Sequence, residues 1–165
     1  MDKRGLLGGG VLLNVLFPIW FFFLVPTWLW LILLPANFAI DSLVLWLAGK
    51  WQKVEDLKAL WKKSILRVWI IGFASDFVGA LACFGFMWLW DVVLDNLITL
   101  RINWILEQTL TGIPGVIVAG LLIYFLNKAF SFRKAGLEKD RIERICKALA
   151  IATAPYTMLI PLYWW

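Results

Sequence analysis

Two aspartates stand inside strongly apolar stretches and are the first candidates for chemistry. Asp76 lies in IIGFASDFVGALACFGFMWLW, residues 70–90, and Asp41 lies in ANFAIDSLVLWLAG, residues 36–49. An ionised carboxylate at membrane depth costs at least ~2.5–3.5 kcal/mol, so such a residue usually faces protein or a water-filled path. Each aspartate is therefore expected either to handle a cation or a proton, or to join helices as a neutral, hydrogen-bonded group.

The neighbours of Asp76 indicate where its side chain points. Gly72, Gly79 and Cys83 recur at helical spacing around it and form a stripe of small residues. Small residues let two helix backbones approach closely in a membrane. We therefore predict that Gly72, Gly79 and Cys83 form a helix-packing face, and that Asp76 faces protein instead of lipid.

Further polar side chains extend this set. Asn37 precedes Asp41 by four residues, so the two share one face of a helix. Apart from Lys50 at the very end of one predicted span, no lysine or arginine lies in a predicted span to neutralise either aspartate, so a proton or an exogenous cation is the expected partner. The candidates for an ion or proton pathway are Asp76, Asp41, Asn37, Ser75 and Asn14.

Several kinds of chemistry are not expected. The chain has no histidine, and its two cysteines, Cys83 and Cys146, lack the spacing of metal ligands. A glycine-rich phosphate loop, HExxH, GxSxG and an acidic two-metal cluster are also absent from the sequence. We predict no metal, no cofactor and no catalytic residue, and hence no enzyme.

The amino-acid composition indicates the kind of structure that must position these residues. Hydrophobic residues make up 62% of the 165-residue chain and charged residues 16%, whereas charged residues are about 25% of ordinary soluble proteins. Several apolar runs approach the ~20 residues that cross a bilayer as a helix. The prediction is an all-α, polytopic integral membrane bundle forming one transmembrane domain over residues 1–165.

About five membrane-crossing segments are expected, some of them short or kinked. Pro35 is taken as the turn between the first two, and the second is short enough that it could instead be re-entrant. The predicted spans are 11–34, 36–50, 68–90, 112–127 and 148–165, with interfacial amphipathic helices at 51–66 and 92–110 and a cytoplasmic loop at 128–147.

The distribution of basic residues predicts the orientation. With five spans and a cytoplasmic N-terminus, 15 of the 16 lysines and arginines lie on the cytoplasmic side and only Arg101 lies outside. The positive-inside rule favours this arrangement. We expect a plasma (inner) membrane protein whose C-terminus is outside.

The basic cytoplasmic surface is expected to contact anionic lipids, whose headgroups attract each lysine or arginine by ~1 kcal/mol. Nucleic acid is not an expected partner. The predicted lipid contacts are Lys50, Lys53, Lys62, Lys63, Arg67, Arg133 and Lys134.

Three functions are compatible with these residues. The first is an oligomeric channel or transporter for cations or protons that uses the intramembrane aspartates, which a homo-oligomer would bring together from several copies. The second is a non-transporting subunit or scaffold that binds a partner membrane protein or anionic lipid. The third is an intramembrane lipid-modifying enzyme, for which no second catalytic group is evident.

Overall fold

The structure is a computed structural model in which residues 28, 30–90, 92, 104–133 and 135–160 are described. All regular structure in these residues is helical. The elements are α3 (Trp30–Trp51), α4 (Leu57–Leu89), α6 (Trp104–Leu126), the π-helical turn η2 (Asn127–Ser131), α7 (Lys139–Ala152) and the 3-10 turn η3 (Tyr156–Leu159). The all-α prediction is thus confirmed for this part of the chain.

Among the described residues, three helical segments are long and apolar enough to cross a membrane. They are Trp30–Trp51, Leu57–Leu89 and Thr109–Ser131. The expected count of about five spans is not confirmed, because the segment from 148 on does not continue as one helix. There α7 ends at Ala152, and η3 follows as a short, separate turn. Most of the predicted first span and of the interfacial helix at 92–110 lies outside the described residues.

The boundaries within the first half of the chain also differ from prediction. No turn occurs at Pro35, which lies inside α3. A proline removes only its own backbone donor, and membrane helices tolerate this where other contacts compensate. The indole Nε1–H of Trp69 donates to the carbonyl oxygen of Leu34 at 3.2 Å and ties this stretch of α3 to α4.

No break separates the predicted interfacial helix at 51–66 from the predicted span at 68–90. Instead the chain turns after Trp51, with Lys53 in the left-handed region at φ 52°, and α4 then continues for 33 residues. The side chain of Asp56 caps α4 by accepting a hydrogen bond from the Ala59 amide at 2.8 Å. The amphipathic and apolar parts of this stretch are therefore two parts of one helix.

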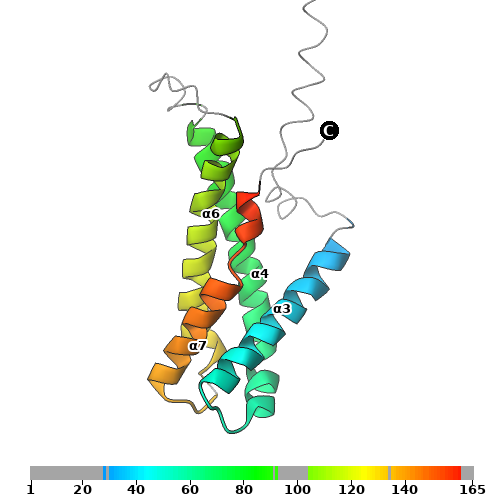
Figure 1. The fold of residues 1–165 in the computed structure, drawn as a ribbon, viewed down its shortest axis with the longest axis vertical. Coiled ribbons are helices and arrows are strands. Elements are labelled where there is room, and N and C mark those ends of the chain that lie inside the picture. Colours follow the sequence, from blue (N-terminus) through cyan, green and yellow to red (C-terminus); the bar gives the residue numbers. More distant parts are fainter. Residues whose placement is uncertain (1–27, 29, 91, 93–103, 134, 161–165) are drawn as a thin grey trace, which may run out of the picture.

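The helices pack as a bundle in which α4 lies between α3 and α6 (Figure 1). Helix α4 contacts both α3 and α6, while α7 contacts α3 and α6. Figure 1 shows α4 and α6 side by side and α3 inclined against them. A buried core joins α3, α4, α6 and α7 at one end of the bundle; its members are Leu45, Ala48, Leu60, Ile65, Val68, Ile123, Phe132, Ile145, Cys146 and Leu149.

This packing gathers the described basic residues at one end. The C-terminal end of α3, the N-terminal end of α4, the C-terminal end of α6 and the N-terminal end of α7 lie together at the lower end in Figure 1. Lysines and arginines lie at the ends of α3, α4 and α7 that meet here, and Lys128 lies in η2 directly after α6. We call this the basic end of the bundle.

Candidate intramembrane carboxylate site

Asp41 and Asp76 are brought to the same contact between α3 and α4. Asp41 is 1% exposed and Asp76 is 5% exposed, and the two carboxylates are close enough to interact electrostatically. Sequence position alone did not determine that they meet, since they are 35 residues apart in different helices. We refer to them as the aspartate pair.

The aspartate pair lies deep along both helices. Lys50, the nearest basic residue of α3, is nine positions from Asp41, and Arg67 of α4 is nine positions from Asp76. At 1.5 Å per residue each interval is ~13.5 Å, close to half of a ~30 Å hydrocarbon core. Both carboxylates therefore lie at about the same distance from the basic residues of their helices, in the apolar part of each helix.

Two further residues complete the contact. The Asn37 side-chain amide nitrogen donates to Asp76 Oδ2 at 3.4 Å. On α4, a Cβ added to Gly72 would lie 3.0 Å from Asp41 Oδ2, so the glycine leaves room for that carboxylate. Asn37 and Asp41, one turn apart on α3, thus face Gly72 and Asp76, one turn apart on α4.

Part of this cluster has no hydrogen-bond partner. Asp41 Oδ2 and Asp76 Oδ1 are buried without a partner among the described residues. The segments 30–49 of α3 and 68–89 of α4 contain no lysine or arginine. Two ionised carboxylates side by side in such surroundings would be strongly unfavourable, so a proton or a cation between them is the simplest compensation.

The other predicted pathway residues have different roles or lie elsewhere. The Ser75 hydroxyl is buried but donates to the carbonyl oxygen of Ile71 at 2.6 Å, within its own helix. Ser42, which follows Asp41 in the sequence, also has a buried hydroxyl oxygen without a partner among the described residues. Asn14 lies outside the described residues.

The predicted packing residues contact two different helices. Gly72 faces α3, as described above, whereas Gly79 and Cys83 face α6. A Cβ on Gly79 would lie 2.7 Å from the Gly115 carbonyl oxygen, and Cys83 Sγ donates to the Gly112 carbonyl oxygen at 3.6 Å. The stripe thus passes from one interface to the next along α4.

The predicted lipid-contacting residues lie at the basic end. Arg67 is only partly exposed and donates to the Phe130 carbonyl oxygen at 3.3 Å, which links α4 to η2. Lys134 lies outside the described residues. Of the predicted set, the exposed side chains are those of Lys50, Lys53, Lys62, Lys63 and Arg133.

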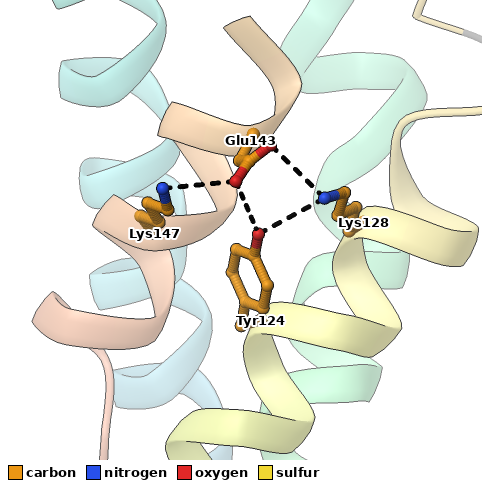
Figure 2. A network of polar contacts seen from close by, with 4 residues as sticks. All are labelled: Tyr124, Lys128, Glu143 and Lys147. Carbon is orange, nitrogen blue, oxygen red and sulfur yellow. Dashed lines mark hydrogen bonds and ion pairs between the residues drawn. The ribbon is translucent and has the colours of Figure 1, made fainter. Parts of the chain in front are cut away.

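One polar cluster near the basic end was not predicted. Glu143 of α7 accepts a hydrogen bond from the Tyr124 hydroxyl at 3.1 Å and pairs with Lys147 at 3.2 Å and with Lys128 at 3.4 Å (Figure 2). The ammonium group of Lys128 also lies 5.5 Å from the centre of the Tyr124 ring. Figure 2 shows how these contacts join α6 to α7.

The sequence indicated this polar cluster only through the four-residue spacing within two pairs of its members. Tyr124 and Lys128 are four residues apart, as are Glu143 and Lys147, so each pair shares a helix face. Hydrogen bonds from Lys147, Tyr124 and Lys128 hold the pKa of the Glu143 carboxyl below its usual range. The ionised form of Glu143 is therefore the one that this contact stabilises.

Comparison with known proteins adds no further constraint. No family model matches the chain, and neither a curated protein nor a solved structure matches it. The site must be interpreted from its own geometry.

Proposed function

We propose that the protein is an oligomeric membrane channel or transporter for protons or cations in which the aspartate pair is the binding site. The observation that carries this proposal is the meeting of two buried carboxylates from neighbouring apolar helices, far from any lysine or arginine of those helices. Such groups are expensive to bury in a membrane and typically mark ion or proton pathways.

The donor set favours a proton over a metal ion. A hard cation such as Mg²⁺ or Ca²⁺ requires about six to eight oxygen ligands. Within the described residues no group of three or more acidic, cysteine or histidine side chains is placed to hold a metal ion. Two carboxyl groups with one amide donor are enough, in contrast, to hold and release a single proton.

Movement of α3 relative to α4 is the proposed means of access. The aspartate pair is almost fully covered in this arrangement, so a proton reaches it only when the α3–α4 contact opens or when water enters along it. A second copy of the chain would then form the other wall of the pathway, which is why the proposal includes an oligomer. The basic end would face the cytoplasm of an inner membrane, because lysines and arginines are enriched on that side.

The test is flux through the purified full-length protein in liposomes. An internal pH-sensitive dye reports proton entry driven by a potassium diffusion potential, and parallel vesicles with sodium- or potassium-sensitive dyes report cation entry. We expect Asp76→Asn and Asp41→Asn each to lower proton flux at least about tenfold while circular dichroism shows unchanged helix content. Ser64→Ala is the matched control, since Ser64 is a buried polar residue of α4 outside the aspartate pair.

The outcomes separate the proposal from its main alternative. If both asparagine variants conduct like the wild-type protein, the aspartate pair is not the pathway. If the wild-type protein carries no flux and purifies with a second protein in fixed stoichiometry, the chain is a non-transporting subunit. In that case the pair would serve as a proton-bridged clamp between α3 and α4.

A further inference from the structure

A hollow lies beside α7 near the basic end of the bundle. It has a volume of about 410 Å³ and lies between the C-terminal end of α3 and the outer face of α7. Its lining is formed by Ala48, Trp51, Gln52, Arg144, Lys147 and Ala148. Two cations, an indole and an amide therefore surround one space.

The charges of this hollow are not balanced by the protein. Arg144 is exposed and forms no ion pair with the described residues. Lys147 pairs with Glu143, but that single carboxylate is also paired with Lys128. The hollow is thus complementary to an anion, and an arginine next to a lysine suits a phosphate because the guanidinium binds two of its oxygens at once.

The depth of the hollow matches the headgroup region. Trp51 is 82% exposed at its edge, and Ile151, one turn beyond Lys147, is 68% exposed. Exposed tryptophan is typical of the membrane interface, and exposed isoleucine is expected on the lipid side of it. The surface of α7 therefore changes from charged to apolar directly after Lys147.

An apolar groove continues from Lys147 on the other side of α7. It lies between α6 and α7, has a volume of about 390 Å³, and includes Ile117, Gly120, Leu121 and Ala150 in its lining. Lys147 lines both the hollow and this groove. On α6 the groove extends from Val116 to Tyr124, which is ~12 Å of helix and less than half of the ~30 Å core.

We propose that this corner of α7 binds one anionic phospholipid. Its phosphate lies between Arg144 and Lys147 beside Trp51, and one acyl chain lies in the groove between α6 and α7. The apolar groove is the reason for assigning a lipid instead of a free phosphate ion, since a soluble anion would leave the groove unused. The site does not include the aspartate pair and does not depend on the proposed transport function.

The test is native mass spectrometry of the full-length protein in detergent, titrated with phosphatidylglycerol or with phosphatidylcholine. We expect the wild-type protein to retain one phosphatidylglycerol at least about tenfold more tightly than phosphatidylcholine. The double variant Arg144→Gln, Lys147→Gln should lose this preference. Its matched control is Lys58→Gln, Lys139→Gln, which removes the same charge from exposed positions outside the hollow.

A second variant tests the acyl chain without changing charge. A Cβ added to Gly120 would lie 3.8 Å from the Ala150 carbonyl oxygen, so a small side chain fits there and a longer one extends into the groove. Gly120→Leu should weaken phosphatidylglycerol binding about tenfold, whereas Gly120→Ala should change it less. If the double variant fails to fold, Gly120→Leu still tests whether the lipid binds in the groove.

Two results would overturn the proposal. Equal losses in the double variant and in its charge-matched control would mean that only overall charge attracts the lipid. Competition by millimolar inorganic phosphate, combined with wild-type lipid binding by Gly120→Leu, would mean that the hollow binds a soluble phosphate without an acyl chain.

Discussion

Gly79 of α4 and Gly115 of α6 lie directly against each other where the two helices cross. A Cβ on Gly79 would lie 2.7 Å from the Gly115 carbonyl oxygen, and a Cβ on Gly115 would lie 2.6 Å from the Gly79 carbonyl oxygen. Because each glycine faces backbone, neither clash is relieved by turning a side chain. The α4–α6 contact therefore depends on the absence of both side chains.

Gly115→Ala should destabilise the bundle by forcing α4 and α6 apart. Overpacking of this kind typically costs ~1–3 kcal/mol. Unfolding of the purified protein in detergent, followed by circular dichroism, measures the change in the free energy of unfolding.

Gly85→Ala is the control in α4, because nothing lies within 4 Å of a Cβ at Gly85. That variant should be neutral or more stable by up to ~1 kcal/mol, since alanine favours helix more than glycine does. Equal stability of Gly115→Ala and the wild-type protein would contradict the packing described for this crossing.

At pH 7 we expect the aspartate pair to hold one proton. The reason is that the two carboxylates interact, and the described residues supply only the Asn37 amide to oppose their charge. Infrared spectra of the protein in liposomes should therefore show a carboxylic acid C=O band that is absent from the Asp41→Asn, Asp76→Asn double variant. If the wild-type and double-variant spectra are identical in that region, the pair is fully ionised and must bind a cation.

Asn37→Leu should disturb the aspartate pair without removing either carboxyl group. The substitution removes the amide donor that contacts Asp76 Oδ2 at 3.4 Å. Leaving a buried polar group without its partner costs ~1–3 kcal/mol. We expect lower thermal stability and, in the liposome assay, altered proton flux. Asn37→Gln, which keeps an amide, is the comparison, and flux like wild type in both variants would show that the amide contact is not needed.

Glu143 should make stability depend on pH in the acid range. Hydrogen bonds from Lys147, Tyr124 and Lys128 lower its pKa, whereas an unfolded glutamate titrates at about 4.3. The unfolded state therefore binds a proton first as pH falls, so the stabilising contribution is complete above the unfolded value and is lost as pH falls through the folded one.

Glu143→Gln should accordingly flatten the loss of stability below pH ~4, where the unfolded carboxyl of the wild-type protein is protonated first. The measurement is the midpoint of thermal unfolding across the acid range. Glu138→Gln is the control, because Glu138 is 79% exposed in its side chain and has one ion pair, with Arg141 at 3.5 Å. A Glu143→Gln profile parallel to that of the wild-type protein would show that the network of Figure 2 contributes nothing in solution.

Cys146 should be unreactive in the folded protein. Its side chain is fully buried, and burial raises the pKa of the thiol to about 12, so the reactive thiolate is scarce at neutral pH. In a Cys83→Ala background, maleimide should label Cys146 only after unfolding in dodecyl sulfate. Rapid labelling of the native protein would mean that α7 separates from α3 and α6.

The sequence contained enough information for the helical class because long apolar runs without strand alternation leave few alternatives in a membrane. It also contained the repeat of small residues along α4, because helical spacing depends only on local geometry. The sequence did not show which residue of another helix each of these small residues contacts. Gly72 faces Asp41 of α3, whereas Gly79 faces Gly115 of α6, and such pairings depend on how whole helices cross.

The helix boundaries were harder to predict for a related reason. Charged and apolar stretches at 51–66 and 68–90 suggested two elements, yet a helix passes from the headgroup region into the core without a break because its backbone hydrogen bonds are satisfied internally in both places. Pro35 was interpreted as a turn, although one missing donor does not stop α3. The Tyr124–Glu143 contact joins two helices, and the sequence indicates it only through the four-residue spacing of polar residues within each helical segment.

Helix α4 runs without a break from the basic end into the apolar part of the bundle. Its 33 residues extend ~50 Å, well beyond the ~30 Å of a hydrocarbon core, and its lysines lie in the first turns while Asp76 and Gly79 lie in the apolar remainder. Leu60, Ile65 and Val68 of this first part are buried in the core shared with α3, α6 and α7. The aspartate pair lies on the same two helices, α3 and α4, so a single continuous contact between these helices carries both the core at the basic end and the buried carboxylates.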